Sequence, residues 1–307
     1  MTRVATANSY STVLSDLMRA QSRQQEAQTQ VSSGRTASDL RGFARNAETL
    51  LAARSVQTRI DGFLGQGQAL SNRLVAQDLA LTQTADAAQG ARLAIVDALA
   101  AGRGDSLGGQ MASWFGSAVE SLNAQHAGQY LFSGGQIDIK PVTVTRLSDL
   151  TGAPDLSDAF ANDSLATISR LDENSTIRSG FLADEIGKPL FDSFRQVQAY
   201  IEANGPFGGV LTAAQTTFLE GIVGQFESAR EGLTQVAQTN GLNQNRLEAS
   251  MDQQKDRQMI LKGTVSDVVD VNMAEAITRL EQAQTATQAT AQVFTMLKDS
   301  SLLYLLR

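Results

Sequence analysis

The sequence predicts a mainly α-helical protein. Its N- and C-terminal segments are expected to form an elongated antiparallel helical bundle, or coiled-coil rod, with a small β-rich insert domain. The 307-residue chain contains only 4 prolines and 6% aromatic residues, which favours long helices with thin cores. Apolar residues recur at intervals of three and four on both sides of the middle. The middle itself is rich in Gly, Asp, Ser, Thr and β-branched residues, which is typical of strands and turns.

Charge and composition exclude several classes of function. The formal net charge is -7 and arginines are scattered among acidic residues, so a nucleic-acid surface is not expected. The absence of cysteine excludes disulfides, thiolate metal sites and a cysteine nucleophile, and suits a protein that leaves the reducing cytoplasm. The sequence has neither an apolar run long enough to span a membrane nor a signal peptide at its start. We therefore expect no membrane partner and, if the protein is exported, no cleaved signal.

The first predicted helix covers residues 8–31. Its apolar residues at helical spacing include Leu14, Leu17 and Val31. In the segment VSSGRTASDLRGFARNA that follows, Gly34 is expected to end this helix, because glycine readily adopts the left-handed conformation found beyond helix C-termini. Ser38 is expected to cap the next helix.

Two further helical runs, 43–64 and 69–101, precede the glycine-rich break AGRGDSLGG. A shorter helix is predicted over 110–126. The β-rich insert is expected over 129–182, where the segments IDIKPVTVT and ATISRLDENSTIRSGF have the alternating pattern of strands.

Helical periodicity then resumes near Leu190 and breaks again at GPFGG. Thr212 and Gln215 have the spacing of a capping box at the start of the next helix. No proline follows up to residue 299, which predicts one or two very long helices. At 1.5 Å per residue, forty helical residues span roughly 60 Å.

The stretch LEQAQTATQATAQVF, residues 280–294, has only three large apolar side chains. An isolated helix of this length is marginal in water, so neighbouring helices must hold it, and small Ala and Thr side chains let them come close. The Leu-rich end SSLLYLLR allows two interpretations: it folds back on a local core, or it belongs to an interface with other copies of the chain. We predict an assembly interface that includes Leu14, Leu17, Val31, Met273, Ile277, Leu280, Val293, Phe294, Leu297, Leu302, Leu303 and Leu305.

No set of residues indicates catalysis. The single histidine, His126, is more typical of a surface or capping residue than of a ligand. The segments FSGGQ and GRGDSLGG lack the Lys-Ser/Thr pair of a phosphate loop and are interpreted as turns. Arg103-Gly104-Asp105 within the second segment is interpreted as part of a helix break. We expect no enzyme activity, no metal and no cofactor.

Three stretches carry a resemblance to a known family. They are QTQVSSGRTASDL after the first helix, NAQHAGQYLFSGGQIDIKPV at 123–142, and VDVNMAEAITRLEQAQTATQATAQVFTMLKDSSLLYLL at 269–306. Together they resemble the flagellin superfamily, and within it the hook–filament junction proteins, the group of flagellar hook-associated proteins that the middle stretch favours over flagellin. Two positions depart from the family pattern: DLRGFARNA replaces an Asp-Asp or Asp-Asp-Pro turn, and Asn272 stands where Asp is usual.

The resemblance implies an adaptor ring of identical subunits in the bacterial flagellum, between a hook-side junction protein and the first layer of flagellin. It also implies export without a cleaved signal through the flagellar type III apparatus, with an export chaperone, and terminal helices that order on assembly. The domains expected on this basis are a polymerisation helix (1–40), the two parts of a helical rod (41–128 and 183–275), the insert (129–182) and a C-terminal polymerisation helix (276–307). A filament-forming flagellin and a cytosolic coiled-coil scaffold protein are the alternatives.

Overall fold

The computed structural model describes residues 2–43, 46–152 and 154–305, with side chains described from 11 to 297 apart from residues 44, 45 and 153. The chain divides into two compact units. The terminal unit combines residues 1–60 with 256–307, and the central unit consists of residues 61–255. The fold is mainly α-helical with two small antiparallel sheets, as predicted.

Two long helices contribute to both units. Helix α2 spans Ala47–Ala101 and helix α6 spans Ala213–Val269. The prediction of two separate helices over 43–64 and 69–101 was wrong, because the helix continues through the glycine-rich segment GFLGQGQ. The reason is packing: a Cβ at Gly67 would lie 3.0 Å from the Met251 side chain of α6, so the small residue permits a close approach between the helices.

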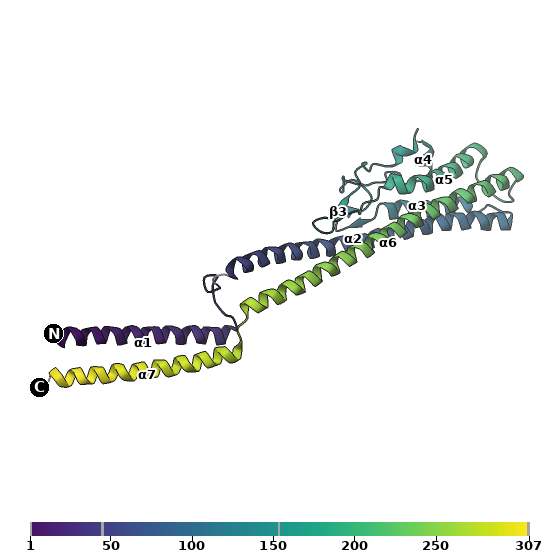
Figure 1. Ribbon diagram of the computed structural model, residues 1–307. Helices are drawn as coiled ribbons and strands as arrows, with labels where there is room; N and C mark the ends of the chain where they lie inside the picture. Colours follow the sequence, from purple (N-terminus) through teal and green to yellow (C-terminus); the bar gives the residue numbers. More distant parts are fainter. Residues whose placement is uncertain (1, 44–45, 153, 306–307) are drawn as a thin grey trace. The chain divides into compact units, whose positions relative to one another are not determined.

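In the central unit, α2 and α6 run side by side in opposite directions (Figure 1). The buried residues of α2 recur at alternating intervals of three and four from Leu74 to Ala98, which is the spacing of a coiled-coil seam. Helices α3 (Leu107–Leu122) and α5 (Ala183–Asn204) complete the core. Its centre is a group of aromatic rings from three helices, with centroids 5.0 to 5.4 Å apart: Phe115, Phe191, Phe194 and Phe226.

The strands lie only partly where they were predicted. One hairpin, β1 (Gln125–His126) with β2 (Gln129–Tyr130), begins just before the insert, and the other pairs β3 (Ile168–Arg170) with β4 (Thr176–Arg178) inside it. The second pair confirms the strands expected in ATISRLDENSTIRSGF. The segment IDIKPVTVT forms a single antiparallel bridge, between Val142 and Phe160, and no longer ladder. The Asn123 side chain bonds both backbone groups of Val142, at 3.1 and 2.9 Å. Helix α4 (Leu147–Gly152) and the 3-10 helix η2 (Leu156–Ala159) occupy the rest.

The two glycine-rich segments that look like binding motifs are structural turns, as predicted. The helix stop at Gly34 depends on a local hydrogen bond. The GRGDS turn, in contrast, is hydrogen-bonded to the GPFGG segment, which is distant in the sequence. Asp105 accepts hydrogen bonds from the Gly209 N–H at 2.7 Å and from Arg103 Nε at 3.0 Å. These bonds, the backbone one first, hold the pKa of Asp105 below its usual range. In FSGG, the Gly135 N–H donates to Asp163 Oδ1 at 2.9 Å.

Two of the predicted helix boundaries are confirmed by their local hydrogen bonds, whereas the helix predicted over 110–126 is α3 and spans Leu107–Leu122. Gly34 lies just past the end of α1 (Thr2–Ser33) with φ of 68° and donates to the Gln30 carbonyl. Thr212 and Gln215 form the reciprocal capping box at the start of α6, with bonds of 2.9 and 3.2 Å. Ser38 does not cap α2, since the following turn is organised by Asp39, whose side chain accepts from the Gly42 N–H.

One ion-pair network connects α2 to α6. Glu227 accepts from Arg230 Nη2 at 2.6 Å and from Arg92 Nε at 2.8 Å. Arg230 first, and then Arg92, lower the pKa of Glu227 from 4.5 to about 2. Because the folded state favours the ionised carboxylate, this contribution to stability is complete above the unfolded pKa near 4.5 and is lost as the pH falls toward 2.

We expect Glu227→Gln to lower the free energy of unfolding at pH 7 and to flatten its decline between pH 4.5 and 2. Denaturant titrations at a series of pH values measure both effects. Glu220→Gln is the control, because Glu220 is an exposed carboxylate on the same helix. Equal pH profiles for the native chain and Glu227→Gln would contradict the assignment.

Candidate assembly interface on the terminal helices

The terminal unit pairs the first and last helices of the chain. Helix α1 (Thr2–Ser33) and helix α7 (Met273–Leu305) lie side by side in opposite directions (Figure 1). The side chains of α7 that are buried or half-buried recur at alternating intervals of four and three, as do those of α1. The seam between these two helices is therefore coiled-coil-like. On α7 it consists of Ala276, Leu280, Ala283, Thr287, Thr290, Phe294 and Leu297.

This seam is thin, which explains the unusual composition of residues 280–294. Its fully buried apolar members are small: Ala20 and Ala27 on α1 and Ala276 on α7. Burial stabilises by only about 0.8 kcal/mol per methylene-sized group, so such residues contribute little each. They allow two backbones to approach closely. A pair of helices held by so little apolar surface is marginal by itself.

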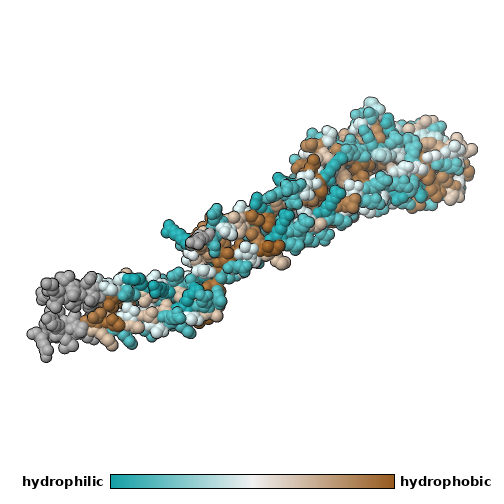
Figure 2. All heavy atoms as spheres, in the orientation of Figure 1, coloured by the Kyte–Doolittle hydropathy of each residue, from teal (hydrophilic) through white to brown (hydrophobic). Residues whose placement is uncertain are grey.

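Several large apolar residues of both helices flank the seam and remain exposed. Figure 2 shows hydrophobic residues gathered on the visible face of this pair, next to the grey atoms. Within the described residues, six such side chains are 43% to 69% exposed: Leu14, Met18, Met273, Ile277, Val293 and Met296. These exposed apolar side chains make the helix pair a candidate for an interface with another chain.

The predicted interface residues therefore fall into three groups. Leu17, Val31, Leu280, Phe294 and Leu297 are half-buried in positions of the seam spacing within one chain. Leu14, Met273, Ile277 and Val293 are exposed. The side chains of Leu302, Leu303 and Leu305 lie outside the described residues. Met18 and Met296 are also exposed but were not among the predicted interface residues. Their helical spacing from Leu14 and Val293 could have indicated that they lie on the same faces.

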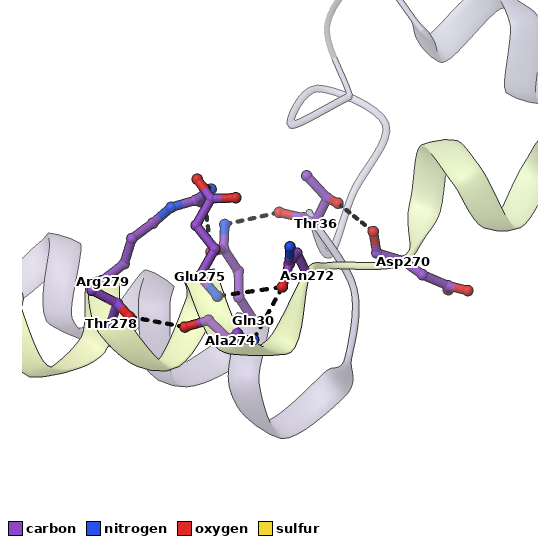
Figure 3. A network of polar contacts seen from close by, with 8 residues as sticks. All are labelled: Gln30, Thr36, Asp270, Asn272, Ala274, Glu275, Thr278 and Arg279. Atoms are coloured by element: carbon purple, nitrogen blue, oxygen red, sulfur yellow. Dashed lines mark hydrogen bonds and ion pairs between the residues drawn. The ribbon is translucent and has the colours of Figure 1, made fainter.

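A network of hydrogen bonds joins the C-terminal end of α1 to the N-terminal end of α7 (Figure 3). The turn after α1 forms an antiparallel bridge between Arg35 and Asp270. The Thr36 N–H donates to the Val269 carbonyl at 2.8 Å, and the Val271 N–H donates to the Gly34 carbonyl at 3.0 Å. These bonds connect residues more than 230 positions apart in the sequence, so they position the start of α7 against the end of α1.

The Gln30 side chain links this bridge to α7. It is 9% exposed and donates from Nε2 to the Thr36 carbonyl at 2.9 Å. Its Oε1 accepts from Arg279 Nη1 at 3.4 Å, and Arg279 also pairs with Glu275 at 2.5 Å. An uncharged amide can serve both helices here without the desolvation cost of a buried charge.

An open groove of about 740 Å³ runs between α1 and α7. Its walls carry charges of both signs, from Asp16, Arg19, Arg23, Glu26 and Arg279, together with small residues of the seam. Because both positive and negative side chains line its walls, the groove does not favour a small ligand of either charge. The arrangement suits another helix surface with complementary polar groups.

The segment VDVNMAEA begins α7, and its one departure from the family pattern is explained by capping. Asn272 Oδ1 accepts hydrogen bonds from the backbone N–H groups of Ala274 at 3.1 Å and Glu275 at 3.4 Å. Asn and Asp are about equally effective as N-caps, so the exchange preserves this function.

Just before this cap, the Ser266 hydroxyl donates a hydrogen bond to the Asp270 carboxylate.

The described residues contain no group of three or more His, Cys, Asp or Glu side chains that could hold a metal ion. Within the same residues, no helix is long and apolar enough to cross a membrane. His126 lies half-buried at the end of β1, directly before the tight turn of the first hairpin.

Comparison with solved structures shows what this fold resembles. A protein described as a flagellar hook-associated protein from Vibrio parahaemolyticus matches with a TM-score of 0.60 at 16% identity, over 73% of this chain and 97% of the other. FlgL from Bacillus cereus matches with a TM-score of 0.54 at 12% identity, over 71% of this chain and 99% of the other. At such low identity these similarities establish the fold alone. No curated protein sequence matches the chain.

The C-terminal segment matches a family model. Residues 223–306 match the family model described as the bacterial flagellin C-terminal helical region. This segment of the chain is therefore similar to the C-terminal helical region of bacterial flagellins. The matched segment includes most of α6, the Asn272 cap and all of α7, so the α7 side of the candidate interface lies within it.

The Asn272 cap can be tested by two substitutions. Asn272→Ala removes the acceptor for two N–H groups and should destabilise α7 by about 1 kcal/mol. Asn272→Asp retains the acceptor and adds a negative charge at a helix N-terminus, so it should be neutral or slightly stabilising. Hydrogen exchange at Ala274 and Glu275 measures the difference. Equal protection in both variants would contradict the capping role.

Proposed function

We propose that this protein is an adaptor subunit that joins the flagellar hook to the filament. In this proposal, identical subunits form a ring, and the paired terminal helices of each subunit pack against those of its neighbours. The observation that carries the proposal is the thin α1/α7 seam, flanked by large apolar side chains that stay exposed within one chain. Packing between copies would bury these side chains and stabilise a pair that is marginal alone.

The choice of a junction subunit over a filament-forming flagellin follows the resemblance of the central stretch to the junction proteins, and the fold agrees with it. The two matched structures, one a hook-associated protein and the other FlgL, are covered over 97% and 99% of their lengths. The stretch YLFSGG supports the same choice, since it resembles the junction proteins. In this proposal the partners are a hook-side junction protein and flagellin. The subunit reaches the flagellum through the type III export apparatus, with a chaperone and without a cleaved signal.

Electron microscopy of cells that lack this gene tests the function directly. Bare hooks, with flagellin shed into the medium, are expected if the protein is the junction subunit. Filaments that remain attached to hooks would contradict this function and favour the flagellin alternative or a role outside the junction. Restoration of attached filaments by the native gene is the control.

The interface is tested by complementation of that strain with point variants. Val293→Asp places a charge on an exposed apolar position, so the free chain should keep its helix content in circular dichroism but fail to restore attached filaments, because an unpaired charge buried between copies is costly. Gln292→Asp is the matched control, since the neighbouring Gln292 is exposed and already polar. Normal attachment with Val293→Asp would show that this flank is not an interface.

A further inference from the structure

The seam between α2 and α6 in the central unit contains a polar layer. Apolar or small residues fill most of this seam, but Gln77 of α2 and Asn240 and Asn243 of α6 occupy buried positions with the same three-four spacing. Gln77 and Asn240 are both 0% exposed. The layer separates the large core cluster, which begins at Ala80, from a small cluster around Leu74 and Leu247.

Part of this layer makes direct bonds across the seam. Asn240 Nδ2 donates to the backbone carbonyl of Leu74 at 2.8 Å, and Gln244 Nε2 donates to the same carbonyl at 3.3 Å. Leu74 is less than one helical turn from Gln77 on α2, so Asn240 and Gln77 lie in adjacent positions of the seam. Asn243 Nδ2 donates to the Arg178 carbonyl at 2.9 Å, which attaches the β4 strand to the same place.

Other buried polar atoms of this layer have no hydrogen-bond partner among the described residues. They are Nε2 and Oε1 of Gln77, Oδ1 of Asn240 and Nε of the neighbouring Arg73. Burial also lowers the pKa of the Arg73 guanidinium. Two of these atoms are donors and two are acceptors. Four unsatisfied buried atoms in one place are costly unless a further group completes their bonds.

We propose that this layer binds internal water and sets the register, meaning the axial alignment, of α2 against α6. A water molecule can donate to Gln77 Oε1 and Asn240 Oδ1 and accept from Gln77 Nε2 or Arg73 Nε, which satisfies donors and acceptors together. Buried polar atoms at a local polar site with two to four partners are the setting in which internal waters occur.

The register function follows from the repetitive character of the rest of the seam. The small residues Ala88, Ala91 and Ala98 of α2 recur at seam spacing, so a shift of seven residues would place similar residues opposite one another. Such a shift moves Gln77 toward Leu233 or Leu247, and Asn240 away from Gln77. The two amides would then lie in separate apolar layers without shared water, a cost that penalises the shifted state.

The register is measured by crosslinking between introduced cysteines. Because the chain has no native cysteine, only the introduced pair can react. Cysteines at Arg92 and Glu227 report the native register, because these side chains contact each other at 2.8 Å. Cysteines at Arg92 with Glu220, or Arg92 with Thr234, report shifts of seven residues, which amount to about 10 Å along the helix. A short thiol crosslinker such as dibromobimane distinguishes these alignments.

In the otherwise native full chain, we expect crosslinking of the native pair at least tenfold above both shifted pairs. In the double variant Gln77→Leu/Asn240→Leu, at least one shifted pair should gain crosslinking, while the unfolding temperature stays equal or rises because an apolar layer replaces buried amides. Thr84→Val is the matched control, since Thr84 is buried in the same seam but its hydroxyl bonds only to the Ala80 carbonyl of its own helix. Native-only crosslinking in the double variant would overturn the register function.

A crystal structure of the unsubstituted chain tests the layer independently of whether the double variant folds. We expect an ordered water within hydrogen-bonding distance of the Gln77 amide and Asn240 Oδ1. A direct bond between these two amides with no water would overturn the hydrated layer.

Discussion

The antiparallel pairing of α2 with α6 is the constraint on which the central unit depends. It brings together residues that are far apart in the chain, such as Leu74 with Asn240 and Arg92 with Glu227. The three-four spacing supplies the contact surface, and packing across it provides much of the stability of both helices. Helices α3 and α5 and the insert then pack on this pair through the aromatic cluster of the core.

The terminal unit uses the same principle with much less apolar surface. The small residues Ala20, Ala27 and Ala276 let the backbones of α1 and α7 come close. The bridge between Arg35 and Asp270 aligns the end of α1 with the start of α7. The large side chains are left at the flanks of the seam, where they add little to the single chain. A pair of this kind agrees with the proposed packing against other copies, which would cover these side chains.

Several segments that resemble binding motifs have a role in folding. Asp105 of the Arg-Gly-Asp sequence closes a turn against Gly209, and Asp163 holds the FSGG turn through the Gly135 N–H. In both cases a carboxylate satisfies backbone N–H groups that a glycine-rich turn leaves without partners in regular structure. The structural role of such a short motif depends on the segment to which it is hydrogen-bonded.

The sequence by itself determined the helical fold class, the breaks at AGRGDSLGG and GPFGG, the capping box at Thr212 and the glycine stop at Gly34, because these depend on local backbone chemistry and on residue spacing. It also predicted that residues 280–294 need close neighbours. Tertiary structure decided the features that depend on distant segments. Met251 packs against Gly67 and lets α2 continue through a glycine-rich stretch. Val142 pairs with Phe160 in a single bridge, while the Asn123 side chain bonds its backbone groups. The division of the terminal apolar residues into a seam and an exposed flank likewise required the pairing of the two chain ends, since spacing along one helix does not reveal which side its partner occupies.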